Sequence, residues 1–208
     1  MTPAEPALRL VLLTSRGGGH CMHIAEQIAA GAIRGVVLAA IVTENPQAPV
    51  IDKCRQRGLP LQVIPWPGAP QRVQHELAVC AALQALEADL VGLVGYLRLV
   101  GPALVHPWQG RLFNLHPSLL PAHPGLNAIN RAFDAGDARL GATVHWVDEG
   151  CDTGAPIVQR GFDRAPGEGR EAVADRVHCL EAELLTEAIN GLATTLARRC
   201  RVALATED

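Results

Sequence analysis

The feature that most constrains this fold is a regular alternation of two kinds of segment in the first half of the chain. Four continuous runs rich in Val, Leu and Ile cover 8–14, 35–43, 59–65 and 89–95. Three segments with helical spacing of apolar residues lie between them, at 20–33, 49–57 and 70–87. Runs without polar alternation are typical of strands covered on both faces. Strand, helix and strand in this order predict βαβ units and a parallel sheet.

This alternation of apolar runs and helical segments ends at Gly101. An apolar run at 110–116 ends in polar residues, and a loop with two prolines follows at 119–125. Further segments predict a short helix at 127–135, a hairpin of 141–148 with 155–161, and a last helix at 170–197. We therefore predict one α/β domain over residues 1–208. Its core is a single open, mostly parallel twisted sheet with helices on both faces, and its two halves are residues 1–100 and 101–208.

Composition and charge exclude several functional classes. Of the 208 residues, 49% are hydrophobic and 19% are charged, which is a globular balance and not that of a disordered chain. The formal net charge of -3 gives no strong attraction to nucleic acid or to an anionic membrane. Lys53 is the only lysine and lies in Asp-Lys-Cys, so a P-loop, which needs Gly-Lys-Ser/Thr, is excluded. A Schiff-base mechanism would also have to use Lys53.

The six cysteines indicate reduced thiols in a cytoplasmic protein. They stand at 21, 54, 80, 151, 179 and 200, and no two of them form a Cys-x-x-Cys pair. The N-terminus lacks the basic start and long apolar core of a signal peptide. Apolar stretches stay well short of the roughly 18 residues that cross a bilayer. We therefore expect small-molecule substrates, with neither nucleic acid nor a membrane as partner.

A glycine-rich turn follows the first predicted strand and precedes a predicted helix. Gly17, Gly18 and Gly19 are followed by His20, and a glycine run at this place lets backbone N–H groups approach an anion at the helix N-terminus. The turn is not a dinucleotide fingerprint, because Met22 stands where the third glycine of Gly-x-Gly-x-x-Gly belongs. The alternatives are a phosphate-binding turn and a tight turn without a ligand.

Four polar residues of catalytic type lie at predicted strand ends and in the hairpin. Asn114 and His116 close the run 110–116, and alternation along a strand places them on the same face. His145 and Asp152 flank the hairpin turn, and a carboxylate near a histidine fixes its tautomer and raises its pKa. A structural role for a single histidine is the simpler interpretation, but the grouping of four such residues favours catalysis.

A metal site is the alternative interpretation of the same residues. His116, His145 and Asp152, with Cys151 beside them, are chemically suitable ligands, but they form no His-Glu-x-x-His and no close ligand pair. His20 and His23 have helical spacing without an obvious third ligand. We therefore predict no metal, and a metal-dependent hydrolase stays as a second hypothesis.

Two long motifs carry a resemblance to a known family. Residues 114–125, NLHPSLLPAHPG, and residues 141–159, GATVHWVDEGCDTGAPIVQ, are similar to the signature region of the formyltetrahydrofolate-dependent formyltransferases. The resemblance implies their Rossmann-like fold, with phosphate binding in residues 1–100 and catalysis in 101–208. It implies transfer of a formyl group from 10-formyltetrahydrofolate to a primary amine without a metal. The branch that formylates glycinamide ribonucleotide in purine biosynthesis is the most similar.

The same resemblance implies roles for individual residues. It implies catalysis by Asn114, His116 and Asp152, with His145 and Ser118 in supporting positions. It places the acceptor's phosphate on Gly17, Gly18, Gly19 and His20, and its ribose portion on Glu181. It assigns folate binding to Arg72, Tyr96, Leu97, Arg98, Leu99 and Val100.

The chain also departs from that branch. The turn reads Ser-Arg-Gly-Gly-Gly-His where Ser-Gly-x-Gly-Ser-Asn is usual, and Ile129 replaces a common histidine. Segments 127–132 and 148–154 look more like the wider family, which leaves an amino-sugar nucleotide as an alternative acceptor. The length of 208 residues argues against the branch that acts on methionyl-tRNA, whose members carry a second C-terminal domain, so we do not expect that acceptor. A non-catalytic folate-binding module is a further alternative, and we expect a monomer or a homodimer.

Overall fold

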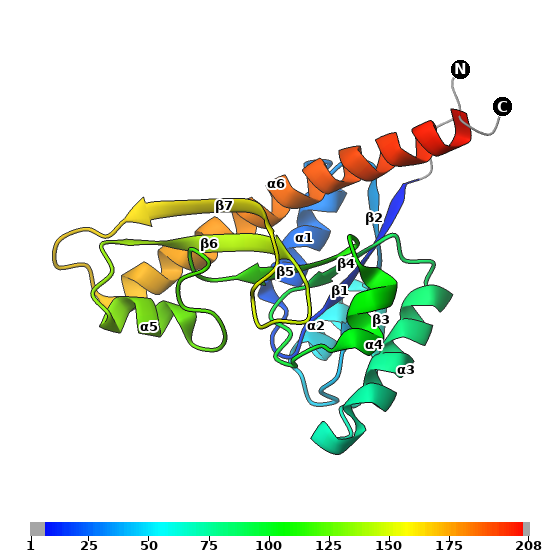
Figure 1. The fold of residues 1–208 in the computed structure, drawn as a ribbon, viewed down its shortest axis with the longest axis horizontal. Helices are drawn as coiled ribbons and strands as arrows, with labels where there is room; N and C mark the ends of the chain where they lie inside the picture. Colours follow the sequence, from blue (N-terminus) through cyan, green and yellow to red (C-terminus); the bar gives the residue numbers. More distant parts are fainter. Residues whose placement is uncertain (1–6, 206–208) are drawn as a thin grey trace.

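The computed structural model describes residues 7–205, with side chains through Leu196. Its strands form one seven-stranded sheet in the order β3-β2-β1-β4-β5-β6-β7, flanked by helices (Figure 1). The strands are β1 Leu8–Leu13, β2 Val36–Thr43, β3 Leu61–Val63, β4 Leu90–Leu93, β5 Leu112–His116, β6 Arg139–Trp146 and β7 Pro156–Asp163. The helices are α1 Gly19–Ala29, α2 Val50–Arg57, α3 Arg72–Ala85, α4 Pro102–Val105, α5 Ala128–Asp134 and α6 Arg170–Ala205, with 3-10 turns η1 Ala69–Gln71 and η2 His106–Trp108.

The strand order reverses between β1 and β4. The chain moves outward from β1 through β2 to β3, and then crosses back so that β4 pairs with the other side of β1. Every pairing from β3 to β5 is parallel, whereas β5, β6 and β7 pair antiparallel. The predicted open, mostly parallel sheet is confirmed. In such sheets the point of reversal opens a ligand crevice at the carboxyl ends of the strands.

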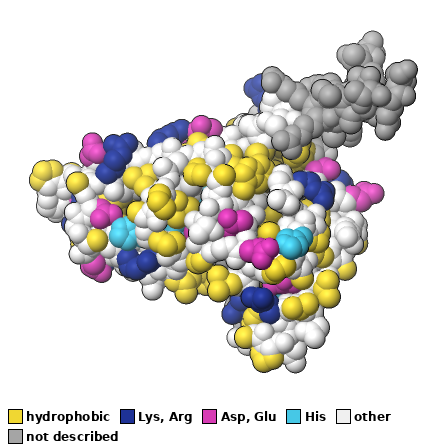
Figure 2. All heavy atoms as spheres, in the orientation of Figure 1, with side chains coloured by type: hydrophobic (Ala, Val, Ile, Leu, Met, Phe, Trp, Pro, Cys, Tyr) yellow, Lys and Arg dark blue, Asp and Glu magenta, His cyan; other side chains and the backbone are white. Residues whose placement is uncertain are grey.

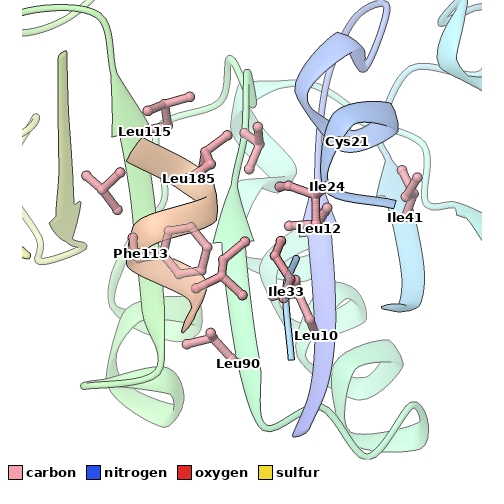
Figure 3. Packing of buried hydrophobic residues seen from close by; sticks show 14 of the residues in the cluster. Leu10, Leu12, Cys21, Ile24, Ile33, Ile41, Leu90, Phe113, Leu115 and Leu185 are labelled. Atoms are coloured by element: carbon pink, nitrogen blue, oxygen red, sulfur yellow. The ribbon is translucent and has the colours of Figure 1, made fainter. Parts of the chain in front are cut away.

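Helices cover both faces of the sheet, which explains the continuous apolar runs. Along β1, Leu10 and Leu12 pack in one core with residues of α1, α2 and α6, part of which Figure 3 shows. Val11 and Leu13 lie in a second core with residues of α3 and α4. Because successive side chains of a strand point to opposite faces, a strand between two helical layers needs apolar residues in a row, as at 10–13 of β1.

Two parts of the helix prediction need correction. α6 continues to Ala205 and does not end at 197, because residues 192–205 contain neither Pro nor Gly to stop it. α4 and η2 were not predicted, because elements of four and three residues are too short to show a helical period. The assignment of residues 1–208 to one domain stays a prediction.

The structure also bears on the cysteines and on membrane spanning. Cys21, Cys54, Cys80, Cys151 and Cys179 are free thiols, and Cys200 lies outside the residues whose side chains are described. Within residues 7–205, no helix combines the length and the apolar character that crossing a membrane requires.

Phe113 of β5 offers a test of the core. Its side chain is fully buried, and a Cβ atom added to Gly92 would lie 2.6 Å from its ring. Phe113→Ala should lower the free energy of unfolding by about 3–5 kcal/mol, the usual effect of emptying a buried aromatic site. Urea denaturation followed by circular dichroism measures this change. Val73→Ala, at an exposed position of α3, is the control and should change it by less than about 0.5 kcal/mol. Equal losses in the two variants would contradict the core assignment.

Candidate active site

Three side chains predicted to be catalytic meet at the carboxyl end of β5. Asn114 and His116 stand two positions apart on this strand, and Asp152 comes from the turn between β6 and β7. The amide Nδ2 of Asn114 donates to Oδ1 of Asp152 at 3.0 Å. Nδ1 of His116 lies 3.3 Å from Oδ2 of the same carboxylate. The fold therefore gathers these groups from two separate segments around one carboxylate.

Asp152 is held in its ionised form. Burial raises its pKa, but hydrogen bonds from His145 and from the backbone N–H of Gly125, the latter at 2.7 Å, act in the opposite direction. Together with the positive charges of His116 and His145, they lower the pKa to about 2. Asp152 is thus a hydrogen-bond acceptor and a negative charge at any physiological pH.

His145 stands opposite Asn114 in the ladder between β5 and β6. Its Nδ1 lies 2.8 Å from the carbonyl oxygen of Trp146, which can only accept, so Nδ1 carries a hydrogen. Nε2 lies 3.2 Å from Nδ2 of Asn114 and 3.4 Å from Oδ1 of Asp152. This contact orients the Asn114 amide and is consistent with the supporting position predicted for His145.

Both ring nitrogens of His116 face acceptors. Nδ1 faces the carboxylate of Asp152, and Nε2 lies 2.9 Å from the carbonyl oxygen of His123. Neither partner has a hydrogen to donate, so the doubly protonated ring satisfies both contacts. The side chain of His123 pairs with Asp137 at 2.7 Å, which holds this carbonyl in place.

Ser118 bonds to the loop after β5 and not to the three central residues. Its Oγ donates to the carbonyl oxygen of Ala122 at 2.6 Å, and Oγ1 of Thr143 donates to the carbonyl oxygen of Ser118 at 2.6 Å. Nε2 of Gln159 donates in turn to Oγ1 of Thr143 at 2.9 Å. Neither Thr143 nor Gln159 was predicted to belong to the site. A threonine within an apolar strand was the available signal.

The glycine turn closes β1 and opens α1. Gly18 has a φ of +58°, and a Cβ atom there would lie 2.4 Å from Cγ2 of Val50, so the position requires glycine. Its neighbours Gly17 and Gly19 line a cavity of about 540 Å³ at the N-terminus of α1. Nζ of Lys53 reaches this cavity and donates to the carbonyl oxygen of Gly17 at 2.8 Å. The turn therefore combines free backbone N–H groups with a cation that the sequence analysis had not placed there.

Glu181 joins the turn to α6. Its Oε2 lies 3.2 Å from Nε2 of His20 and 2.7 Å from Nδ1 of His178. Burial raises the pKa of Glu181, but hydrogen bonds with His178 and His20 outweigh it, and the pKa is lowered overall. The hydrogen bond to Glu181 raises the pKa of His178 above its ordinary value of 6.5. His178 was missed in the sequence, where its spacing of three residues from Glu181 on a helix was the only signal.

The same three residues offer ligand atoms for a metal ion. Within residues 7–196, His20, His178 and Glu181 have donor atoms that all lie within 4.8 Å of one another. Arg16, Lys53 and the N-terminus of α1 add positive charge to the cavity beside them. This surplus of positive charge favours an anion at this place over a cation.

The residues predicted to bind folate gather in the loop after β4, apart from Arg72 at the start of α3. The backbone N–H of Leu97 donates to Oγ of Ser15 at 2.7 Å, so this loop is tied directly to the glycine turn. Leu97 and Leu99 are 39% and 68% exposed and offer apolar contact area. Arg72 lies close to the far end of the loop, because a Cβ atom on Gly101 would come within 3.0 Å of its Nη2.

A second cavity, of about 390 Å³, lies beside the turn that carries Asp152. Its lining comes from the end of α4, from η2 and its C-terminal neighbour, and from residues 147–150. Nε2 of His106 and Oε1 of Glu149 approach to 2.6 Å across these two segments. The sequence analysis assigned no role to these residues, although 147–150 fall inside the motif at 141–159.

Comparison with known proteins agrees with this geometry. The family model described as formyl transferase matches residues 8–189. Phosphoribosylglycinamide formyltransferase of Bacillus subtilis is 38% identical over 143 residues, which cover 69% of this chain and 73% of that protein. A trifunctional purine biosynthetic protein of Drosophila pseudoobscura is 33% identical over 94% of this chain, which spans only 14% of its length. The crystal structure of glycinamide ribonucleotide transformylase 1 from Symbiobacterium toebii superposes with a TM-score of 0.87 at 30% identity, covering 94% of this chain and 92% of that one.

Fold and site together define an open α/β protein with a glycine-rich turn at the sheet reversal and an Asn–His–Asp group beside it. Proteins of this class hold small ligands in the crevice between those features. Because the family model spans most of its length, the chain belongs to the formyl transferase family.

The glycine turn yields a stability prediction with a matched control. Gly18→Ala should lower the free energy of unfolding by at least about 1–2 kcal/mol, because alanine at a φ of +58° is strained and its Cβ meets Val50. Gly19→Ala should change it by no more than about 0.5 kcal/mol, because a Cβ atom there meets nothing within 4 Å. Thermal and urea unfolding of both variants compare the two positions. Equal stability of the two variants would be incompatible with the turn described.

Proposed function

We propose that this protein transfers the formyl group of 10-formyltetrahydrofolate to the primary amine of glycinamide ribonucleotide, in purine biosynthesis. The observation that carries the proposal is the carboxylate of Asp152, which gathers Asn114 and His116 in a member of the formyl transferase family. The names of the bacterial relatives support the acceptor. We place the enzyme in the cytoplasm, as a monomer or homodimer that acts on small molecules.

The proposed mechanism rests on charge that develops on the formyl oxygen. When the amine attacks the formyl carbon, this oxygen becomes negative, and N–H donors of Asn114 and His116 stabilise it. In the free protein, His116 Nε2 donates to the carbonyl of His123, so the formyl oxygen has to replace or share that acceptor. Catalytic hydrogen bonds commonly form fully only when the substrate is bound.

Asp152 has two tasks in this mechanism. Its negative charge beside Nδ1 of His116 stabilises the protonated ring, which the oxyanion needs as a partner. It also takes the proton that the attacking amine loses, directly or through water. This proton passes on to N10 of the folate as the bond between N10 and the formyl carbon breaks and tetrahydrofolate leaves. Because the pKa of Asp152 is about 2, the carboxylate is ionised at neutral pH, and it relays the amine's proton without retaining it.

The acceptor occupies the cavity at the glycine turn. Backbone N–H groups at the N-terminus of α1 point toward its phosphate, and Lys53 and protonated His178 add positive charge. Glu181, buried between the two histidines, is the acceptor for a ribose hydroxyl. Ile129 also lines this cavity, where a histidine is common in the enzymes that act on glycinamide ribonucleotide. An amino-sugar nucleotide is therefore the alternative acceptor.

Substitution of the three central residues tests the reaction. Asn114→Ala, His116→Ala and Asp152→Asn should each lower kcat by roughly 10²-fold or more, because each removes a group that acts in the transition state. The assay is release of tetrahydrofolate from 10-formyltetrahydrofolate with glycinamide ribonucleotide as acceptor. Cys151→Ala is the control next to Asp152 and should retain activity, since no thiol takes part. Near-normal turnover by Asp152→Asn would reject the proposed role of the carboxylate.

The acceptor site predicts a pH dependence. As pH rises above 6.5 and through the raised pKa of His178, the ring loses its charge, so the acceptor's KM should increase. His178→Gln should raise this KM by about tenfold at pH 6.5 and flatten its rise with pH. The KM of the folate should not change in the same variant, which serves as the internal control.

An acceptor panel completes this test. Phosphate-free glycinamide riboside should be a much poorer substrate than glycinamide ribonucleotide. Equal rates with both compounds would count against the phosphate site, and a preference for an amino-sugar nucleotide would move the assignment to the wider family.

A further inference from the structure

Two buried glutamates hold the loop that follows β4. The side chains of Glu44 and Glu76 are only 1% and 3% exposed. Oε1 of Glu44 accepts from Nε of Arg98 at 3.0 Å. Oε1 of Glu76 accepts from the backbone N–H of Gly101 at 2.8 Å and lies 3.3 Å from Nε of Arg72. One carboxylate therefore holds the loop at Arg98, and the other holds its end at Gly101.

The start of the same loop is held by a third contact. Nδ1 of His75 lies 3.2 Å from the carbonyl oxygen of Pro65, and its Nε2 lies 2.9 Å from the hydroxyl of Tyr96. Because the carbonyl requires a hydrogen on Nδ1, the neutral ring accepts the Tyr96 hydroxyl hydrogen at Nε2. Burial lowers the pKa of His75 and raises that of Tyr96, which keeps both groups neutral. Trp66 packs against the edge of His75, with ring centroids 5.1 Å apart.

Stability alone does not account for the two glutamates. Oε2 of Glu44 and Oε2 of Glu76 are buried without a hydrogen-bond partner among the residues described. Burying a carboxylate with one oxygen unsatisfied is unfavourable, and apolar residues of similar size would pack the same space at lower cost. A buried carboxylate of this kind can instead serve to hold a neighbouring side chain or loop in one orientation.

The groups that they orient are the two arginines. Nε of Arg98 is hydrogen-bonded to Glu44, and Nε of Arg72 is ion-paired with Glu76. Each guanidinium thereby leaves its two terminal Nη groups to grip a carboxylate with two parallel hydrogen bonds. The side chains of Arg98 and Arg72 are 38% and 44% exposed, so this end is accessible. The guanidinium of Arg98 also lies 5.2 Å above the ring of Trp66, which limits its rotation.

We propose that Glu44 and Glu76 are positioning residues that fix the loop 96–101 and aim Arg98 and Arg72 at the carboxylates of the folate's glutamate tail. The inference rests on the proposed function, since it takes the folate as the ligand of this loop. Gly101 leaves room for the Arg72–Glu76 pair, because a Cβ atom there would lie 3.0 Å from Nη2 of Arg72 and 3.2 Å from Oε1 of Glu76.

Glutamine variants test the proposal, because they keep the shape of the side chain and remove its charge. Binding is measured by tryptophan fluorescence with 5-formyltetrahydrofolate and with 5-formyltetrahydropteroate, which lacks the glutamate tail. Glu44→Gln and Glu76→Gln should each weaken binding of the tailed compound by about tenfold and that of the tailless compound by less than about twofold. Glu87→Gln, whose side chain is 81% exposed, is the matched control and should change neither.

A further variant covers the case in which a glutamine variant fails to fold. Arg98→Lys keeps the charge but lacks the Nε–H that Glu44 holds, so it should also weaken the tailed compound selectively. Equal weakening of both compounds, or no weakening of either, in the folded variants overturns the positioning roles. Failure of the wild-type protein to bind either compound overturns the proposed function instead, so the two failures are distinguishable.

Discussion

The site depends on the contacts of the Asp152 carboxylate, because they join the parallel part of the sheet to its antiparallel part. Asn114 and His116 end the last strand that pairs in parallel, whereas Asp152 belongs to the connection of an antiparallel hairpin. Its two oxygens take contacts from Asn114, His116, His145 and the backbone of Gly125. Any displacement of the hairpin relative to β5 would break several of these contacts at once, so the catalytic geometry and the sheet edge are stabilised together.

The reversal of strand order brings the two proposed ligand-binding loops together. β1 and β4 are neighbours in the sheet, so the glycine turn after β1 lies beside the loop after β4. Ser15 joins them, since its N–H donates to the carbonyl oxygen of Gly95 at 3.0 Å and its Oγ accepts from Leu97. The proposed phosphate and folate sites therefore share one residue as a common support. A ligand that orders one of these loops also restrains the other, which suits an enzyme that must bring two substrates into contact.

Periodicity made the sheet predictable, and long motifs made the central residues predictable. β1 reads as a buried strand because Leu10 and Val11 meet different helical layers. Asn114 and His116 could be paired by alternation along one strand, and Asp152 stood out beside the predicted hairpin turn, but no local pattern shows that its carboxylate meets the other two. Lys53 and His178 act in the site through contacts that fold the chain back from α2 and α6. Such contacts leave no periodic trace in the sequence, because a polar residue on a helix is ordinarily a solvated one.

The three acidic residues that are buried in the described part of the chain follow one rule. Glu44, Glu76 and Glu181 are each less than 5% exposed, and each pairs with a nitrogen of a partly exposed basic side chain. A buried carboxylate keeps its partner charged and in a fixed orientation, whereas an exposed arginine or histidine alone would lose that orientation to side-chain entropy. The partners differ in a useful way, because the arginines stay charged at every pH whereas the histidines beside Glu181 can be discharged. The arginines of the proposed folate site therefore keep their charge at every pH, and the acceptor site is the one whose charge depends on pH.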